Sequence, residues 1–317
     1  SLSYGQSSSQ SNRTATSDTV RGSTVKAGGT TTIKATGAGA DSNLTVQGSD
    51  VSGRQVNLEA DNQVNLLAAQ NTNTQTSSNS NSSASVGIAL QLGASGGGLG
   101  VTGSVSKGNG NGNGTDTTYT NTHVAGTDSV NIKSGSDTTL KGATVEAKQV
   151  TATVGGNLNI ESLQDTANYA EQNKQVGASG MIGAGASGNV NFAKSNINST
   201  YASVTEQSGI KAGDGGFTVN VQGNTDLKGG AITSTQAAID NNKNTFQTGS
   251  TLTTSDIENK ASYEAKSVSV SIGTGAGSGL SIPGTGLSAN LSGAGMGKDS
   301  GSTSSTTTAG ISGIAGD

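Results

Sequence analysis

The sequence predicts an all-β protein, a parallel β-helix with long β-hairpins inserted between blocks of coils. The composition, a short glycine-containing repeat and the spacing of that repeat lead to this prediction. Glycine accounts for 50 of the 317 residues, aromatic residues for 3% and hydrophobic residues for 30%, whereas a typical globular domain is roughly 45–50% apolar with its usual glycine share of about 7% included. A chain with so few large apolar side chains suits a thin, repetitive β structure that buries one narrow stripe.

The charge argues against intrinsic disorder, the other interpretation of such a polar composition. Disordered chains combine low hydrophobicity with high net charge, but 17 basic and 21 acidic residues leave a net charge of only −4. The same balance argues against nucleic acid as a partner, because binding to nucleic acid needs clustered lysine and arginine.

The first repeated motif is an apolar residue, any residue, a glycine, two further residues and a second apolar residue. It occurs as Val20-Arg-Gly22-Ser-Thr-Val25, Val46-Gln-Gly48-Ser-Asp-Val51, Leu140-Lys-Gly142-Ala-Thr-Val145 and Leu227-Lys-Gly229-Gly-Ala-Ile232. Around it lie triplets with asparagine between two apolar residues, which are Val56-Asn57-Leu58, Val64-Asn65-Leu66, Val130-Asn131-Ile132, Leu158-Asn159-Ile160 and Val219-Asn220-Val221. Alternation of this kind predicts short strands whose asparagines point away from the buried Val, Leu and Ile.

These asparagines have two interpretations. As structure, they stack from coil to coil and form hydrogen-bonded ladders. As function, they form a flat polar face for glycans. The ladder is favoured because the stacking of coils produces it without any ligand.

The spacing of the repeats identifies the architecture. Val25 and Val46 are 21 positions apart, and Leu140 and Ile160 are 20 apart. A repeat of about 20 residues, built from short strands with glycine-rich corners, fits one coil of a parallel β-helix. A leucine-rich repeat has a similar period, but its leucine signature and helical side are missing.

Segments of a second kind interrupt the coils. The predicted coil blocks are residues 20–67, 124–166 and 208–255, and the interrupting segments are residues 68–123, 167–207 and 256–317. Each interrupting segment alternates apolar with small or polar residues and is rich in Gly, Ser and Asn, so we expect long β-hairpins. Residues 1–19 resemble the returning strand of one such hairpin. Because the chain starts at Ser1 rather than Met, we expect this single repetitive region, 1–317, to be a fragment of a larger protein.

Several runs carry a resemblance to a known family. They are Asn157-Leu-Asn-Ile-Glu161-Ser-Leu-Gln-Asp165-Thr, Tyr201-Ala-Ser-Val-Thr-Glu-Gln-Ser-Gly-Ile-Lys-Ala-Gly-Asp-Gly-Gly216-Phe, Gly223-Asn-Thr-Asp-Leu-Lys-Gly-Gly230 and Leu252-Thr-Thr-Ser-Asp-Ile-Glu258-Asn. They resemble the repeats of filamentous-haemagglutinin-type and CdiA-type exoproteins, which are exported by two-partner secretion. The resemblance covers essentially the whole chain and is most specific for the second, C-terminal-side repeat region of contact-dependent growth inhibition exoproteins.

The resemblance implies properties that the residues alone do not. It implies a right-handed parallel β-helix, secretion to the bacterial cell surface by an Omp85-type outer-membrane transporter, and a C-terminal toxin domain in the same polypeptide. It also implies a role in carrying that toxin across the outer membrane of a target cell. No pretoxin segment or toxin domain is visible in these residues, so we assign them no toxic activity.

The sequence offers few candidates for a catalytic, cofactor or metal site. The chain has no Cys and a single His, His123, which argues against thiolate and histidine metal sites. Gly93-Ala-Ser95-Gly-Gly97 fits a hydrolase pattern without a strand-to-helix turn, and Gly98-Leu-Gly100-Val-Thr-Gly103 fits a dinucleotide fingerprint without a following helix. Gly213-Asp214-Gly-Gly216 and Gly39-Ala-Asp41 suggest calcium turns but do not continue into a calcium-binding repeat. We therefore predict no catalytic residue, no cofactor and no metal.

An enzyme remains a rival interpretation, because some β-helix proteins cleave polysaccharides. Such chemistry needs carboxylates paired near the scissile bond. The acidic residues are spread along the chain, and the nearest candidates, at corner positions, are Asp50, Asp61, Asp137 and Asp226. Stacking of coils could still bring distant carboxylates together.

The hairpins contain the candidate functional residues. In 86–95, Val86, Ile88, Leu90, Leu92 and Ala94 share one face of a strand. About ten alternating residues are typical of a strand that crosses a membrane. The candidate membrane-contact residues are Val86, Ile88, Leu90, Leu92, Val101, Val268, Val270 and Ile272.

Two arrangements of the hairpins are possible. Insertion into a membrane requires several hairpins to pair or close, because an open strand edge cannot face lipid. Alternatively, each hairpin lays its apolar face on the β-helix or on its neighbour and covers an edge. We expect a non-enzymatic segment that delivers a toxin across the target-cell outer membrane, or else an adhesin stalk that binds glycans or proteins. An apolar surface of paired hairpins favours the first, and a groove lined by Tyr and Asn favours the second.

Overall fold

The computed structural model describes the whole chain except residues 1, 94–95, 184–185, 276–279, 283–286 and 315–317. Almost all of the described residues lie in β-strands. The helices among them are the short η1 (Gly39–Asp41) and α1 (Gln236–Asp240). The prediction of an all-β protein with parallel β-helical coils is confirmed.

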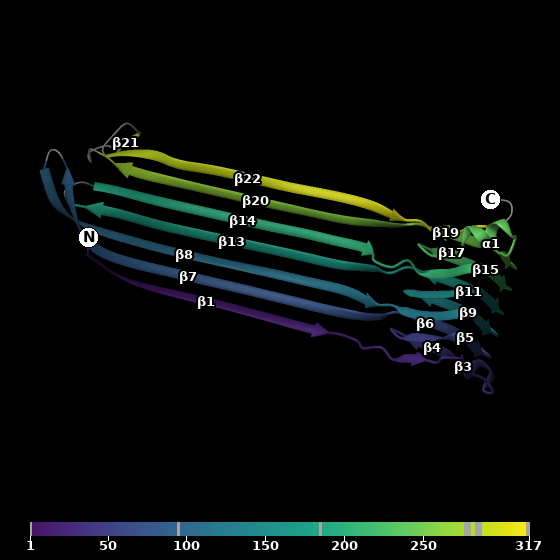
Figure 1. Ribbon diagram of the computed structural model, residues 1–317. Helices are drawn as coiled ribbons and strands as arrows, with labels where there is room; N and C mark the ends of the chain where they lie inside the picture. Colours follow the sequence, from purple (N-terminus) through teal and green to yellow (C-terminus); the bar gives the residue numbers. More distant parts are fainter. Residues whose placement is uncertain (1, 94–95, 184–185, 276–279, 283–286, 315–317) are drawn as a thin grey trace.

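One side of the β-helix is a parallel sheet of six short strands, each from a different coil (Figure 1). Its strands are β4 (Leu44–Gln47), β6 (Val64–Leu67), β10 (Thr138–Lys141), β12 (Leu158–Glu161), β16 (Thr225–Lys228) and β19 (Leu252–Ser255). Leu140 of β10 pairs with Leu66 of β6 and with Ile160 of β12. The chain therefore stacks equivalent residues of successive coils directly on one another.

A nine-stranded parallel sheet forms the rest of the β-helix. Its long strands are β5 (Asp50–Ala60), β9 (Thr122–Ser134), β11 (Ala143–Val154) and β15 (Gly209–Val221), and its short strands are β2 (Thr24–Lys26), β3 (Thr30–Ala35), β17 (Ala231–Ser234), β18 (Thr245–Thr248) and β23 (Gly310–Ile311). The register shifts midway along the long strands, between Gly53 and Gln55 and between Ala147 and Gln149. Each half then pairs with its own partners, so a coil has three strand segments.

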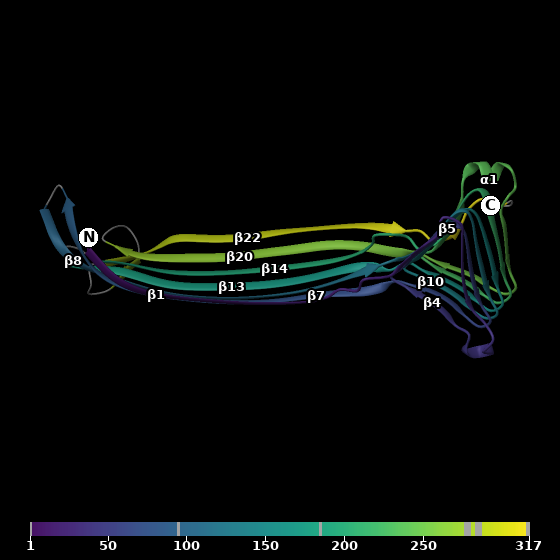
Figure 2. The ribbon, with the colours of Figure 1, turned by 60° about the horizontal axis from the view of Figure 1, so that its bottom comes forward.

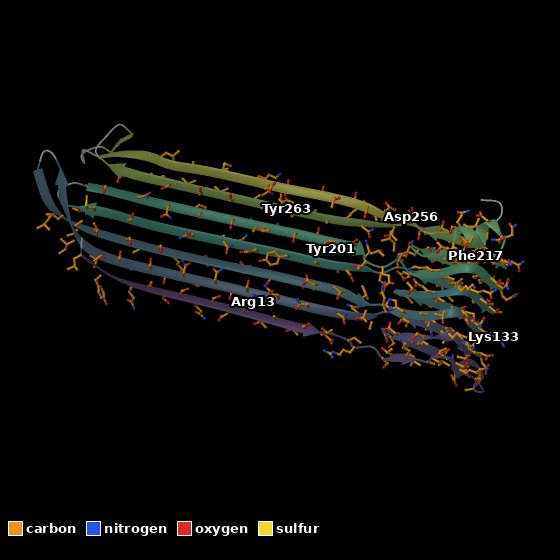
Figure 3. The ribbon with its side chains drawn as sticks, viewed as in Figure 1. Arg13, Lys133, Tyr201, Phe217, Asp256 and Tyr263 are labelled. Atoms are coloured by element: carbon orange, nitrogen blue, oxygen red, sulfur yellow. The ribbon has the colours of Figure 1, made fainter. Side chains whose placement is uncertain are left out.

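The core is a narrow column of aliphatic side chains. Val56, Val130, Val150 and Phe217 are paired in register on neighbouring coils, and all four are fully buried. Figure 3 places Phe217 within the β-helix. Burial of a few aliphatic side chains per coil explains how a chain with 30% hydrophobic residues forms an ordered core.

Polar ladders run along the outside of the coils. Asn131 lies beside Asn57 in the next coil and donates a hydrogen bond from Nδ2 to Oδ1 of Asn57 over 2.8 Å. A second ladder follows a corner, where the backbone N–H of Asn157 donates to Asp137 over 2.7 Å and that of Asn224 donates to Asn157 over 2.9 Å. The stacking geometry alone accounts for these contacts.

The longest strands of the chain belong to one antiparallel sheet beside the β-helix, called here the hairpin sheet. Its strands are β1 (Leu2–Asp18), β7 (Ala69–Gly93), β8 (Gly96–Thr120), β13 (Gln164–Ile182), β14 (Ala186–Val204), β20 (Ile257–Gly275), β22 (Leu287–Thr307) and β21 (Leu280–Ile282), in this order across the sheet. Figures 1 and 2 show a single curved layer that extends to one side of the coils. The hairpins β7–β8, β13–β14 and β20–β22 thus pair with one another, edge to edge, rather than lying on the β-helix.

The hairpins pair because of where they leave the coils. They leave after β6, β12 and β19, which lie on alternate coils of the same side. Neighbouring strands and neighbouring coils are both about 4.8 Å apart, so two coils occupy the same width as the two strands of a hairpin. Three hairpins can therefore form a continuous sheet without a gap.

Glycine turns occupy the corners between the hairpins. Gly48, Gly142 and Gly229 end β4, β10 and β16 with φ between 54° and 64°, and each belongs to the glycine motif found in the sequence. A Cβ atom on Gly142 would lie 2.5 Å from the Cβ of Ala68 and 2.9 Å from a methyl of Leu163, at the bases of two hairpins. At this corner, the chain therefore makes a tight glycine turn in one coil and leaves the β-helix as a hairpin in the next.

Candidate functional site

The hairpin sheet has two faces of opposite character. Successive side chains of a strand alternate between faces, and directly paired residues share a face. Leu2, Ile88, Val101 and Ile182 are paired in register across four strands. The face that carries them is called the apolar face, and the other is called the polar face.

The predicted membrane-contact residues with described side chains all lie on the apolar face. Val86, Ile88, Leu90 and Val101 are 53–60% exposed and lie near the end of the sheet remote from the coils. Val268, Val270 and Ile272 lie on β20, of which Val268 and Ile272 are exposed and Val270 is half-buried. Leu92 pairs with Gly97 in the first hairpin, and its side chain lies outside the described part of the chain.

The structure adds residues from the second hairpin to this set, which sequence reasoning did not select. Val105, Ala178, Val190 and Ile272 form one row across β8, β13, β14 and β20. The apolar band, as we define it, consists of Leu2, Val86, Ile88, Leu90, Leu99, Val101, Val105, Val176, Ala178, Ile182, Val190, Phe192, Val268, Val270, Ile272, Leu291 and Met296. The alternation in Val190-Asn-Phe192 was the available signal, but its length was too short to stand out.

A row of glycines forms the floor of a shallow groove within the apolar band. Gly103, Gly180 and Gly188 are paired in register on β8, β13 and β14. The groove has a volume of about 680 Å³ and is lined on its sides by residues that include Tyr4, Val86, Val105, Val190 and Ile272. A Cβ on Gly103 would meet nothing closer than 3.8 Å, so the groove exists because side chains are missing there.

The polar face at the same level carries small hydroxyl and amide side chains. Ser85 and Ser104 hydrogen-bond to each other over 2.7 Å, and Ser83 and Ser106 over 2.8 Å. Closer to the coils, Tyr169 donates a hydrogen bond to Glu171 over 2.6 Å. One sheet therefore exposes aliphatic side chains on one side and hydroxyl and amide groups on the other.

Tyrosines of the polar face lie nearer the coils than the apolar band does. Figure 3 shows Tyr201 and Tyr263 on the long strands. The Tyr263 hydroxyl donates to Asp299 over 3.2 Å, and the negative charge of Asp299 raises the pKa of Tyr263 above its ordinary value. A shallow groove of about 360 Å³ beside Tyr263 is lined by serines and by Asn198.

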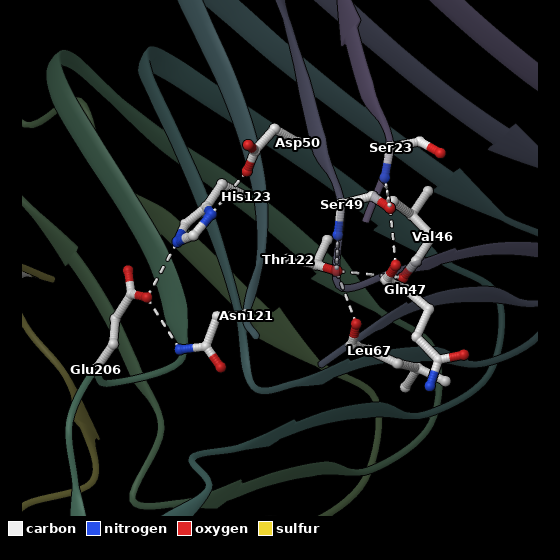
Figure 4. Close-up of polar contacts among 10 residues, drawn as sticks. All are labelled: Ser23, Val46, Gln47, Ser49, Asp50, Leu67, Asn121, Thr122, His123 and Glu206. Atoms are coloured by element: carbon white, nitrogen blue, oxygen red, sulfur yellow. Dashed lines mark hydrogen bonds and ion pairs between the residues drawn. The ribbon is translucent and has the colours of Figure 1, made fainter. Parts of the chain in front are cut away.

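His123 joins a coil to the base of the second hairpin (Figure 4). Its Nδ1 lies 2.9 Å from Asp50 Oδ1 and its Nε2 lies 3.0 Å from Glu206 Oε2. Burial acts to lower the pKa of His123, but hydrogen bonds to the two carboxylates and their charges outweigh burial and raise it. Burial acts to raise the pKa of Glu206, but hydrogen bonds from Asn121 and His123 lower it below its usual value.

This cluster has the geometry of an ion-pair bridge. A histidine acting as a general base needs one free ring nitrogen near the proton it takes, and here both nitrogens face carboxylates. The nearby Ser49 hydroxyl donates to the carbonyl of Gln47 over 2.7 Å (Figure 4). The cluster therefore fastens the hairpin to the coil.

The motifs that suggested a hydrolase, a dinucleotide site, calcium turns or paired catalytic carboxylates lie in strands or at hydrogen-bonded corners where their positions are described. Gly98–Gly103 lies inside strand β8, and Ser95 lies outside the described residues. Asp214 accepts a hydrogen bond from Thr235 over 2.7 Å. Asp61 accepts one from the backbone of Gly37 over 2.6 Å, and Asp137 accepts one from Asn157.

The described residues contain neither a metal-binding cluster nor a membrane-spanning helix. No group of three or more His, Asp and Glu side chains there is arranged to hold a metal ion. No helix in the described part of the chain is long and apolar enough to cross a membrane.

Comparison with known proteins gives consistent matches. The family model described as "Hemagglutinin repeat" matches residues 2–178. The chain is 38% identical over 273 residues to a toxin CdiA of Escherichia coli, 41% identical over 270 residues to a 16S rRNA endonuclease CdiA of Enterobacter cloacae, and 39% identical over 271 residues to a tRNA nuclease CdiA of Yersinia mollaretii. Each match covers 84% of this chain but only 8–9% of the relative's length. No solved structure matches the chain.

Proposed function

Because this chain belongs to the haemagglutinin-repeat family, we propose that it is the part of a contact-dependent growth inhibition exoprotein that engages the outer membrane of a target cell. The β-helix positions the hairpin sheet, and the apolar band of that sheet enters the membrane so that a toxin can follow. The observation that carries this proposal is a continuous apolar band on one exposed face of a sheet built from three hairpins.

The size of the apolar band supports the proposal. Val176 and Ile182 on β13, like Leu99 and Val105 on β8, are six residues apart, which corresponds to about 20 Å along a strand. The apolar band of strands that cross the outer membrane is about 25 Å tall. A contiguous exposed patch of this extent on a soluble protein marks an interaction surface.

The hairpins already satisfy one requirement for contact with lipid. Backbone N–H and C=O groups must be hydrogen-bonded in a membrane, and each strand from β7 to β20 is paired on both sides along most of its length. One open edge of the sheet is β1, and the other is β22 beyond Leu287–Ala289, the residues that pair with the short β21. We propose that these two edges are paired or shielded when the band is inserted.

The names of the relatives support a non-catalytic role for this segment. The same segment occurs at 38–41% identity in proteins named as a toxin, a 16S rRNA endonuclease and a tRNA nuclease. A segment common to proteins with different named activities does not determine those activities. We propose that a toxin domain elsewhere in the same polypeptide supplies the activity, that an Omp85-type transporter exports the protein, and that it resides at the cell surface.

The test is flotation of the purified chain with outer-membrane vesicles, followed by protease digestion. We expect the chain to float, with peptides containing Val86, Val101 and Val268 protected. The variant Val86→Thr, Ile88→Thr, Val101→Thr keeps β-branched side chains but loses apolar surface, so it should partition at least about tenfold more weakly.

The matched control is Ser83→Thr, Ser85→Thr, Ser104→Thr, which changes the polar face at the same level of the same strands. The control should float like the parent chain. Flotation unaffected by the first variant, or cleavage of the three peptides as rapid in vesicles as in buffer, would contradict insertion through the apolar band.

A second candidate function rests on a groove of the polar face. It has a volume of about 300 Å³ and is lined by Asn79, Asn81, Asn173 and Gln175 among others. Amide side chains can hydrogen-bond sugar hydroxyls, which favours an adhesin that binds glycans. If the chain fails to float with protein-free lipid vesicles but floats with outer-membrane vesicles, and soluble outer-membrane polysaccharide competes, the adhesin interpretation leads.

A further inference from the structure

A row of lysines borders the apolar band on its side toward the coils. Lys107 on β8 pairs with Val176, and Lys194 on β14 pairs with Val268, so both share the apolar face with the band. Lys174 on β13 also lies on this face, as do Lys266 on β20 and Lys298 on β22. The lysine row, as we define it, is these five residues.

The positions of the lysines in the row are unfavourable for the stability of the sheet. Lys174 lies directly opposite Lys194, and Lys266 lies directly opposite Lys298, although like charges directly opposite each other destabilise a sheet. Glu264 relieves one of these pairs, with distances of 2.8 Å to Lys266 and 3.7 Å to Lys298. Within the described residues, Lys174 and Lys194 make no ion pair, so this opposition is not relieved inside the protein.

The charges of the two faces differ at this level. Among the described residues of the apolar face between the end of the sheet and the lysine row, none is Asp or Glu. Acidic residues lie nearer the coils on both faces, such as Asp116 and Glu171 on the polar face and Glu258 and Glu264 on the apolar face, but the five lysines of the row all lie on the apolar face. Only the apolar face therefore combines aliphatic side chains with an adjoining cluster of cations.

The distance between the lysines and the end of the sheet suits the hydrocarbon core of a bilayer, which is about 30 Å thick. Lys174 precedes Ile182 by eight residues, and Lys107 follows Leu99 by eight, which corresponds to about 27 Å along each strand. With the apolar band in hydrocarbon, the lysines lie at the level of the headgroups. Lysine is a compact point charge that binds phosphate, and long lysine side chains reach from an apolar surface to the headgroup layer.

From this geometry we infer that the lysine row docks the apolar face onto the phosphate-bearing anionic headgroups of a bilayer leaflet. The inference rests on the proposed function, because it concerns the same surface. It adds the chemistry of the partner and the face of the sheet that meets it. The unrelieved pair Lys174–Lys194 is a site that an anionic phosphate would stabilise.

The test compares two kinds of vesicle, phosphatidylcholine alone and an equal mixture of phosphatidylcholine with phosphatidylglycerol. The variant is Lys107→Gln, Lys174→Gln, Lys194→Gln, which removes the three lysines of the row that make no ion pair with another described residue. A lysine near an anionic surface contributes about a fivefold factor to binding, so the variant should bind the mixed vesicles roughly a hundredfold more weakly at low salt. The difference should shrink at high salt, because salt screens these charges.

The matched control is Lys26→Gln, Lys148→Gln, Lys243→Gln, which removes the same charge from exposed lysines of the β-helix. It should bind the mixed vesicles within a few-fold of the parent chain. An equal loss in variant and control would overturn the inference, because net charge rather than the row would then explain binding. Equal binding of the parent chain to both kinds of vesicle would also overturn it, while leaving insertion of the apolar band intact.

Two further outcomes separate the inference from the proposed function and from a structural role. If the parent chain binds neither kind of vesicle, autonomous membrane engagement fails, and the inference fails with it. We expect the lysine variant to unfold at a temperature no lower than that of the parent chain, because it loses the repulsion between the like charges of Lys174 and Lys194. A clearly lower unfolding temperature would show that the lysines stabilise the sheet and would overturn the inference.

Discussion

At the scale of single residues, the buried side chains of the coils pack on equivalent residues of the next coil, whereas His123 connects different elements. It connects Asp50 of β5 with Glu206 at the base of the second hairpin. Because it is the only histidine of the chain, it is the side chain whose ordinary pKa lies nearest neutral pH. Its titration should therefore dominate any change of stability near neutral pH.

The pKa of His123 is raised in the folded chain, so its contribution to stability is full below the unfolded pKa of about 6.5 and is lost as pH rises through the folded value. Thermal unfolding should thus occur at a higher temperature near pH 6 than near pH 8.5. Because the His123 side chain is 44% exposed, solvent screening limits the effect to less than about 1 kcal/mol.

The variant His123→Gln should remove most of the difference between the two pH values. The control Lys26→Gln removes a positive charge from an exposed residue of the coils and should keep the difference. Circular dichroism followed during heating gives the measurement. An unchanged pH dependence in His123→Gln would mean that the bridge to Asp50 and Glu206 contributes nothing to folding.

At the scale of elements, the corner after each strand of the six-stranded sheet decides between a turn and a hairpin. Gly142 has a φ of 64°, and a side chain there would collide with Ala68 and Leu163 at the hairpin bases. Gly142→Ala should therefore lower the free energy of unfolding by at least about 1 kcal/mol, from the left-handed backbone alone. Denaturation in urea measures the change.

The control for this prediction is Gly28→Ala. Gly28 lies in the turn between β2 and β3, and a Cβ there would meet nothing within 4 Å. The control should be neutral or slightly stabilising, because it restricts the unfolded chain. Equal effects of the two variants would contradict the assignment of Gly142 to a sterically restricted corner.

At the scale of the whole molecule, the hairpin sheet depends on the match between two coils and one hairpin. Deletion of residues 142–161 removes one coil and joins Lys141 to Ser162. Lys141 is paired in register with Glu161, so it occupies the equivalent position at the new junction. The first two hairpins would then leave coils about 4.8 Å apart, although their strands need twice that width. We expect β13 to lose its pairing with β8, and amide hydrogen exchange of β13 to become faster.

The control deletion removes residues 68–161, which contain one whole hairpin and two coils. Leu67, Lys141 and Glu161 are stacked in register, so the new junction has the same geometry. This shorter chain should keep protected amides in β13, now paired with β1. If the one-coil deletion protects β13 as well as the control does, the spacing of the coils does not determine how the hairpins pair.

Local patterns in the sequence were sufficient to predict much of the fold. Strand alternation in triplets such as Val130-Asn131-Ile132 and the spacing of the glycine motif depend only on residues close in sequence, and they predicted parallel β-helical coils. The alternation from Val86 to Leu92 likewise predicted an apolar face of a hairpin strand. The face is a property of one strand, because successive side chains point to opposite sides.

Only the tertiary structure decided how the hairpins lie relative to one another. Pairing of Gly103 with Gly180, or of Lys194 with Val268, joins residues more than seventy positions apart in sequence, and no short-range pattern specifies such a register. The register follows from the stacked coils, which fix where each hairpin starts. The apolar band, the glycine groove and the lysine row therefore exist only after the coils have placed three hairpins side by side, whereas the coils themselves follow from the sequence repeat.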